Sequence, residues 1–91
     1  MNMKESKNEN KITFTIIVNG QPTEVTANIN APLQTAIVEA LHETGNQGQP
    51  PENWQTRDEN GNLLDAKQKI GELGITSSTK LFLGLKAGIG G

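Results

Sequence analysis

The 91-residue sequence predicts an α+β domain in which one mixed β-sheet wraps around a single helix. Three observations favour this fold class: alternating apolar residues near the start, one apolar stripe at helical spacing in the middle, and a second alternating segment near the end. Strands on both sides of one helix bury a face of the sheet against that helix. We expect the order β-β-α-β-β-β, with four to five strands in the sheet.

The first expected elements are two strands joined by a tight turn. In residues 11–18 every second side chain is apolar, which is typical of a strand with one buried face, and the expected inward residues are Ile12, Phe14, Ile16 and Val18. Ile17 is the one apolar residue on the other face. Asn19-Gly20 readily supplies the positive φ angles of a hairpin turn. After Pro22 the alternation resumes with Val25, Ala27 and Ile29.

A single helix is expected next. Asn30 is a candidate N-cap, and Pro32 suits the first turn, where a missing N–H costs nothing. One helical face is then apolar, and its residues are Leu33, Ala36, Ile37, Ala40, Leu41 and Thr44. Gly45 lies where the residue after a helix adopts the left-handed conformation.

The second half is expected to hold shorter elements. Residues 48–52 contain Pro50-Pro51 and form a stiff loop, because proline cannot continue the helix. Residues 54–58 form a short strand, residues 59–62 a turn, and Leu63-Leu64 a brief return strand.

The last expected elements are a helical turn and a strand. The glycines at 71 and 74 lie among apolar residues, which indicates a short turn of helix under the sheet, and those residues are Ile70, Leu73 and Ile75. Residues 80–86 alternate again, with Leu81, Leu83 and Leu85 on one face. The whole order is that of a β-grasp domain over residues 11–86, with a flexible polar tail at 1–10 and a flexible glycine-rich tail at 87–91.

The composition excludes several classes of function. Eight basic and ten acidic residues give a net charge of −2, whereas nucleic-acid binding needs a clustered basic surface. One Trp and two Phe are too few to build a base-stacking platform. Without cysteine there is no disulfide, thiolate zinc site or cysteine nucleophile. No secretory signal is seen, and no stretch approaches the ~18 apolar residues of a membrane span. We expect a cytoplasmic protein, monomeric when free, with no nucleic-acid or membrane partner.

No cluster of residues indicates catalysis, and we expect neither an enzyme nor a resident metal or cofactor. His42 is the only histidine, and helical spacing puts it opposite the apolar stripe, as an exposed side chain rather than a general base. The segment from Asp58 to Asn62 resembles a calcium loop, but Leu63 and Lys69 stand where such a loop needs Gly and Glu, so we interpret it as a turn. Trp54 is expected in the core.

The most informative feature is the end of the sequence. The last strand leads directly into Ala87-Gly88-Ile89-Gly90-Gly91. A carboxylate that is to be adenylated must thread a narrow channel, and residues without Cβ permit the closest backbone approach. The pattern predicts Gly90 and Gly91 as the reactive end, delivered by a flexible tail from a rigid strand.

Across about residues 11–91 the sequence resembles ubiquitin. Gly48-Gln49-Pro50-Pro51-Glu52-Asn53 is similar to the Gly-Ile-Pro-Pro-Asp-Gln that follows the ubiquitin helix. Residues 78–86 with Gly90-Gly91 resemble the ubiquitin ending Ser-Thr-Leu-His-Leu-Val-Leu-Arg-Leu-Arg-Gly-Gly. Gly-Gln-Pro-Pro-Glu-Asn-Trp and Leu-Phe-Leu-Gly-Leu-Lys-Ala-Gly-Ile-Gly-Gly look closer still to a bacterial family of ubiquitin-like proteins, encoded beside an activating enzyme, a conjugating enzyme and a JAB-type metallopeptidase.

This resemblance implies a protein modifier. The Gly91 carboxylate would be adenylated, carried as a thioester on partner cysteines, and joined to an amine or hydroxyl of a target protein. The activating enzyme would use ATP and Mg²⁺ and would recognise the residues before the reactive end, which are Lys86, Ala87, Gly88 and Ile89. The JAB-type metallopeptidase would remove the modifier.

Departures from ubiquitin bear on the choice of partners. Only Lys86 remains of the basic residues before the ubiquitin Gly-Gly. Arg57 and Gly84 stand where ubiquitin has two residues of its exposed aliphatic patch, so receptors for that patch should not bind. A free sheet surface is expected around Gln55, Arg57, Phe82 and Gly84.

Two other functions stay open. A sulfur carrier resembling those of thiamin or molybdopterin synthesis shares the fold and the Gly-Gly end, but its carboxylate becomes a thiocarboxylate. The Pro-Pro loop and the order of the second half favour the modifier. A β-grasp interaction module that is never conjugated would use the free sheet surface instead. For a modifier, attachment to lysine or hydroxyl stays open, as does chain formation through Lys67, Lys69, Lys80 or another lysine.

Overall fold

The structure is a computed structural model that describes residues 10–88. Its elements are strands Lys11–Val18 (β1) and Gln21–Asn28 (β2), helix Leu33–Glu43 (α2), 3₁₀ helix Pro51–Asn53 (η1), strands Trp54–Arg57 (β3) and Leu63–Leu64 (β4), 3₁₀ helix Ile70–Leu73 (η2), and strand Lys80–Leu85 (β5). This order confirms the predicted fold class. The predicted tail at 1–10 lies outside the described residues except for Asn10, as do the last three residues of the tail at 87–91.

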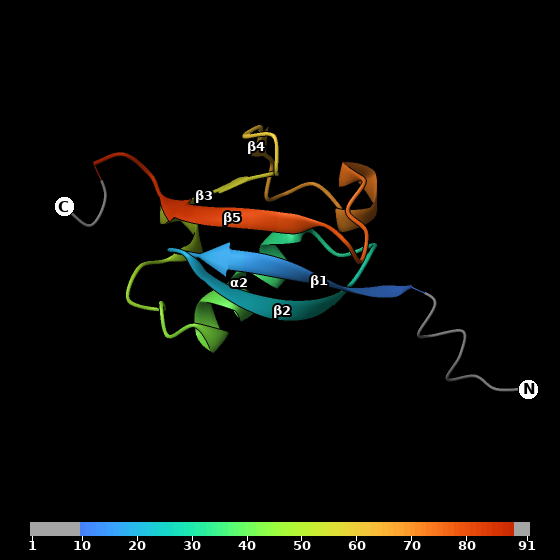
Figure 1. Cartoon of the computed structure of the whole chain (residues 1–91), viewed down its shortest axis with the longest axis horizontal. Helices are drawn as coiled ribbons and strands as arrows, with labels where there is room; N and C mark the ends of the chain where they lie inside the picture. Colours follow the sequence, from blue (N-terminus) through green and yellow to red (C-terminus); the bar gives the residue numbers. More distant parts are fainter. Residues whose placement is uncertain (1–9, 89–91) are drawn as a thin grey trace, which may run out of the picture.

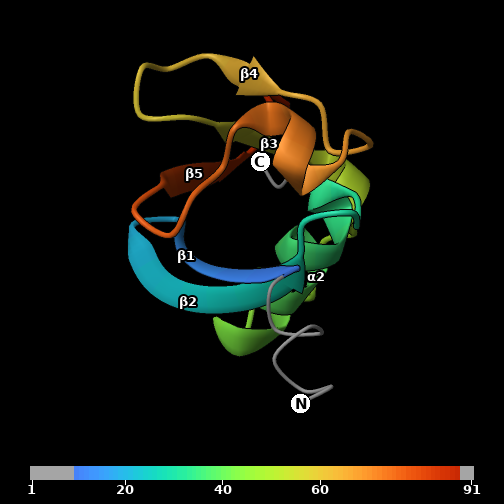
Figure 2. The same ribbon diagram turned by 90° about the vertical axis from the view of Figure 1, so that its right-hand side faces the viewer.

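The five strands form one mixed sheet in the order β2-β1-β5-β3-β4. Strand β5 runs parallel to β1 and antiparallel to β3, so the last strand of the chain lies in the middle of the sheet (Figure 1). The sheet curves strongly, and α2 covers its concave side (Figure 2). The sheet therefore has a buried inner face toward α2 and an outer face that α2 does not cover.

The predicted hairpin between β1 and β2 is confirmed. Val18 pairs with Gln21, and the two residues between them, Asn19 and Gly20, have φ angles of 51° and 84°. Positive φ at both central residues gives the turn a twist that matches that of the flanking strands. Strand β2 begins earlier than the alternation indicated and includes Pro22, which is tolerated because β2 is an edge strand.

The start of α2 differs from the prediction. Pro32 is the N-cap residue, and no side chain caps the helix, so the predicted cap at Asn30 is wrong. The backbone N–H of Asn30 donates to Oδ1 of Asn28 at 2.8 Å. The backbone N–H groups of the first two helical residues donate instead to carbonyl oxygens of the segment before η2, at 2.9 Å each, and these acceptors are Gln68 and Ala66. A distant part of the chain therefore satisfies the helix start.

The core fills the space between α2 and the inner face of the sheet. The predicted helical stripe is buried except for Thr44, which lies half-buried after the last turn, and Gly45 ends the helix with φ 73° as predicted. Trp54 is 6% exposed, which confirms its predicted place in the core. The other buried apolar residues outside α2 are Phe14, Ile16, Val18, Val25, Ala27, Ile70, Ile75, Leu81 and Leu83.

The short elements of the second half match the prediction with small shifts. The predicted strand at 54–58 ends at Arg57, and the stiff loop contains the single turn η1. The predicted helical turn is η2, whose first residue, Ile70, is fully buried. Among residues 10–88, no helix is long and apolar enough to cross a membrane.

Candidate functional site

The predicted reactive tail leaves the domain at the end of β5. Leu85 pairs with Trp54 of β3, and the backbone N–H of Lys86 donates to the carbonyl oxygen of Asn53 at 2.8 Å. Ala87-Gly88 then forms an exposed turn, in which Gly88 has φ 86°. The backbone of Lys86 is therefore fixed to the last residue of η1, directly before β3, while its side chain is exposed.

The predicted tail residues fall into two groups. Lys86, Ala87 and Gly88 are exposed, and their predicted recognition by an activating enzyme stays a prediction. Ile89, Gly90 and Gly91 lie outside the described residues, so their predicted roles stay predictions.

The four residues of the predicted partner surface come together on the outer face of the sheet. Arg57 pairs with Phe82, and Gln55 pairs with Gly84, so the three side chains and the open position at Gly84 share one face. Phe82 is 41% exposed, and no atom lies within 4 Å of a Cβ built on Gly84. The missing side chain of Gly84 leaves a shallow hollow beside Phe82 and Arg57.

Two apolar residues that the predicted surface did not include extend it. Ile17 pairs with Phe82 on one side, and Leu63 pairs with Arg57 on the other. Leu63 is 59% exposed. The break in alternation at Ile17 could have indicated this extension, because an apolar side chain on the outer face of a sheet is a candidate for contact with a partner. Leu63 gave no such signal, since a two-residue strand does not show which face each residue takes.

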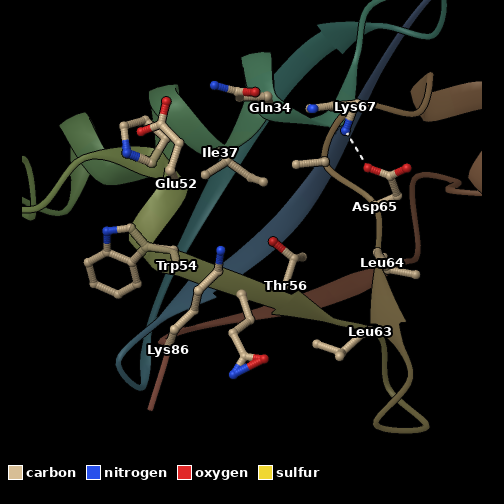
Figure 3. Close-up of a pocket in the computed structure, with 13 residues that line it drawn as sticks. Gln34, Ile37, Glu52, Trp54, Thr56, Leu63, Leu64, Asp65, Lys67 and Lys86 are labelled. Atoms are coloured by element: carbon tan, nitrogen blue, oxygen red, sulfur yellow. Dashed lines mark hydrogen bonds between the residues drawn. The ribbon is translucent and has the colours of Figure 1, made fainter. Parts of the chain in front are cut away.

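A cavity that sequence reasoning did not predict lies between α2 and the segment of β3 and β4. It has a volume of about 340 Å³. Its floor is buried and consists of Ile37, Trp54 and Thr56 (Figure 3). Its rim carries four exposed charged residues, which are Glu52, Asp65, Lys67 and Lys86. Lys86 belongs both to this rim and to the base of the tail.

Trp54 is held firmly at the floor of this cavity. Its side chain lies on the inner face of β3, and its indole Nε1–H donates to the carbonyl oxygen of Gln49 at 3.4 Å. The loop with Pro50-Pro51 therefore positions the ring as well as ending the helix. Sequence reasoning placed Trp54 in the core, and the structure adds that one part of it lines the cavity.

The two weak candidates for chemistry, His42 and Asp58, lie in different places. His42 is exposed on α2. Oδ1 of Asp58 accepts the backbone N–H groups of Asn60 and Asn62 at 2.8 and 2.9 Å, which closes the turn between β3 and β4 as predicted. Within residues 10–88 there is no group of three or more His, Asp or Glu side chains that could hold a metal ion.

Comparison with solved structures identifies the fold. The fold is similar to that of a designed protein based on ubiquitin, with 20% identity and a TM-score of 0.73 over 90% of this chain and 96% of that one. It is similar to the ubiquitin of Caldiarchaeum subterraneum, with 19% identity and a TM-score of 0.69 over 89% and 99% of the two chains. It is also similar to the ubiquitin-like domain of an Arabidopsis thaliana protein, with 22% identity and a TM-score of 0.66 over 86% and 80%. The chain has a ubiquitin-like β-grasp fold.

The chain belongs to the family described as Protein of Unknown function (DUF2604), whose sequence model matches residues 7–91. A curated relative, the uncharacterized protein y4jI of Sinorhizobium fredii, is 52% identical over 81 residues. The match covers 89% of this chain, and the chain spans 62% of the length of that relative. Membership of a bacterial modifier family with neighbouring conjugation enzymes stays a prediction.

Proposed function

We propose that this chain is a protein modifier that acts through the carboxylate of Gly91 once that carboxylate is free. The observation that carries the proposal is the position of the tail. Strand β5 lies in the middle of the sheet, the backbone N–H of Lys86 donates to the carbonyl oxygen of Asn53, and Ala87 and Gly88, which follow, are exposed. A rigid base with an exposed continuation supports delivery of the Gly-Gly end into another protein.

The length of the tail fits this role. Gly91 is the fifth residue after Lys86, and an extended chain spans about 3.3–3.6 Å per residue. The carboxylate can therefore lie roughly 17 Å beyond the sheet, which is far enough to enter an active site below the surface of a partner. Gly88, Gly90 and Gly91 lack Cβ atoms, so the backbone can pass through a narrow entrance.

The chemistry needs three steps, all catalysed by partners. A carboxylate oxygen of Gly91 attacks the α-phosphorus of ATP, and pyrophosphate leaves. A cysteine thiolate of the activating enzyme then displaces AMP to form a thioester, which passes to a cysteine of a conjugating enzyme. An amine or hydroxyl of the target finally displaces that thiolate and leaves an amide or ester bond. A JAB-type metallopeptidase would hydrolyse this bond.

In this proposal the chain is a substrate and not an enzyme. Mg²⁺, ATP and the reactive cysteines belong to the partners, in agreement with a sequence that contains no cysteine. We place the protein in the cytoplasm, as a monomer when free, and assign it neither nucleic acid nor membrane as a partner.

The test uses the chain with activating and conjugating enzymes from its own organism, ATP and Mg²⁺. We expect a covalent band on a partner cysteine on non-reducing gels, which disappears on reduction and is absent with a Gly91-deleted control. A band that resists reduction would show conjugation. Absence of every band with each adenylating enzyme of the organism would contradict the proposal. A sulfur-for-oxygen mass gain at Gly91 in protein from the native host would support the sulfur carrier instead.

A further inference from the structure

We propose that the cavity between α2 and the β3–β4 segment is the anchor site for the enzyme that activates the tail. The cavity would take one uncharged, largely apolar side chain of that enzyme, with a polar group that hydrogen-bonds to the hydroxyl of Thr56. The inference rests on the proposed function and adds to it the site at which the enzyme binds the folded domain.

The cavity has the shape and chemistry of a pocket for one side chain. Binding pockets start at a volume of about 300 Å³ and combine an apolar lining with few polar groups, and this one has about 340 Å³. Ile37 and Trp54 form an apolar floor, and half-buried Leu64 and Ala66 form a wall. An apolar side chain that enters would exchange water for contacts with all four.

The polar group at the floor indicates what the tip of the ligand carries. Thr56 is 3% exposed, and its hydroxyl points into the cavity without a hydrogen bond to any other lining residue (Figure 3). Within residues 10–88, no completely buried side-chain oxygen or nitrogen lacks a hydrogen-bond partner, so this hydroxyl keeps access to water through the cavity. A ligand that displaces that water must offer a donor or acceptor in its place, because a buried hydroxyl without a partner is costly.

The charges at the rim argue for an uncharged occupant. Glu52 and Lys86 lie on one side of the cavity, and Asp65 and Lys67 lie on the other (Figure 3). Each side carries one positive and one negative residue. An anionic or cationic ligand would therefore gain no net attraction, whereas a neutral side chain would leave the four charges in water.

The position of the cavity relative to the tail identifies the partner. Lys86 lies on the rim, and Gly91 follows five residues later, which keeps the reactive carboxylate within roughly 18 Å of the cavity. A standard interface covers about 800 Å² of each partner, which corresponds to a patch of roughly 16 Å radius. A protein that holds Gly91 and packs against the domain on the side of the tail where the Lys86 side chain lies therefore covers the cavity. Side chains that fill such pockets dominate the energy of interfaces.

Two variants of the full chain test the anchor. Ala66→Leu fills the cavity from its wall, and Thr56→Val removes the hydroxyl while it keeps the shape of the side chain. Thr15→Val on the outer face of β1 is the matched control. The readout is ATP–pyrophosphate exchange by the activating enzyme, measured as KM and kcat for each chain.

We expect KM to rise about tenfold for Ala66→Leu and about threefold for Thr56→Val, with kcat unchanged and with Thr15→Val at the wild-type values. Urea unfolding followed by Trp54 fluorescence controls for folding. Thr56→Val keeps the test decisive if Ala66→Leu does not fold. If the wild type is active and neither folded variant changes KM, the anchor is wrong and the proposed function stands. If the wild type gives no exchange with any adenylating enzyme of the organism, both are wrong.

A second readout does not depend on catalysis. Trp54 is the only tryptophan, so a ¹⁵N-labelled chain gives a single indole cross-peak, which comes from a residue that lines the cavity. With a Gly91-deleted chain and no ATP, we expect the unlabelled enzyme to shift or broaden this peak in the wild type. At the same concentration Ala66→Leu should show no change. An indole peak unaffected by enzyme that binds the chain would overturn the anchor.

Discussion

At the scale of single residues, Asp58 shows how one carboxylate organises a loop. Its two oxygens accept hydrogen bonds from the backbone N–H groups of Asn60 and Asn62 and from the Asn62 side chain. These bonds favour the charged form, so the pKa of Asp58 lies below its ordinary value of 3.8, and the backbone N–H of Asn62 is the largest cause. The charged Asp58 therefore stabilises the fold above the unfolded-state pKa, and this contribution is lost as pH falls through the folded-state pKa.

Asp58→Asn should make the stability of the domain less sensitive to acid. Asparagine keeps a side-chain oxygen that can accept the same N–H groups, but it has no charge to lose. Between about pH 6 and about pH 3, the urea midpoint should fall less in the variant than in the wild type, and the two should converge at low pH. Glu59→Gln is the control, since its carboxylate accepts none of these hydrogen bonds. Parallel pH profiles for the wild type and Asp58→Asn would contradict this account.

At the scale of elements, two glycines differ in whether their backbone conformation requires glycine. Gly74 caps η2 in the left-handed region, with φ 74°. Gly84 lies inside β5, where its φ is not in that region and the space beside it is open. Only the first position needs the freedom of glycine.

Gly74→Ala should lower the free energy of unfolding by about 1 kcal/mol, because a Cβ strains the left-handed conformation. Gly84→Ala should leave stability unchanged or raise it by up to about 1 kcal/mol, because alanine loses less freedom than glycine when a strand forms. Urea unfolding of both variants, followed by Trp54 fluorescence, measures the difference. An equal loss at the two positions would show that strain at η2 is not the cause.

The elements with local signals could be predicted from the sequence. The Asn19-Gly20 turn, the apolar stripe of α2 and the alternation of β5 each depend on neighbours in the chain. The cap of α2 could not be predicted, because its acceptors, Gln68 and Ala66, lie more than thirty residues away. Local residue preference therefore predicted Asn30 as the cap, whereas tertiary hydrogen bonds satisfy the start of the helix.

In the candidate site, too, the parts with local sequence signals could be predicted and the parts made by distant segments could not. The sequence brought Gln55, Arg57, Phe82 and Gly84 together correctly, because strand order and alternation fix the face that each residue takes. The cavity was missed, because its lining comes from α2, the η1–β3 segment, β4 and the start of the tail, and no pattern within one segment reports on such a meeting. The position of Trp54 was predicted, but its exposure to a cavity depends on what the helix and β4 leave open.

At the scale of the whole molecule, β5 joins the two halves of the sheet. It separates the β1–β2 hairpin from β3 and β4 and contacts strands on both sides. Leu81 points inward and is fully buried, while its neighbour Phe82 points outward. Damage to the inner face of β5 should therefore affect both halves at once.

Leu81→Ala should lower the free energy of unfolding by about 2–5 kcal/mol, since it removes buried methyl groups and leaves a cavity in the core. Phe82→Ala, one residue away, should cost about 1 kcal/mol or less, because it removes only cross-strand contacts on the outer face. Chemical denaturation measures both values. A similar cost for the two variants would mean that the faces of β5 are assigned wrongly.

The place of β5 beside β1 also has a mechanical consequence. The two strands run in the same direction, with Thr15 opposite Lys80 and Val18 opposite Leu83. A pull on the beginning of β1 and the end of β5 acts along both strands in opposite senses, so the hydrogen bonds between them are loaded together in shear. They cannot open one after another, as they would if the strands were peeled apart. The domain should therefore resist tension between the beginning of β1 and the end of β5. A molecular motor that pulls the tail along β5 would also load these hydrogen bonds in shear.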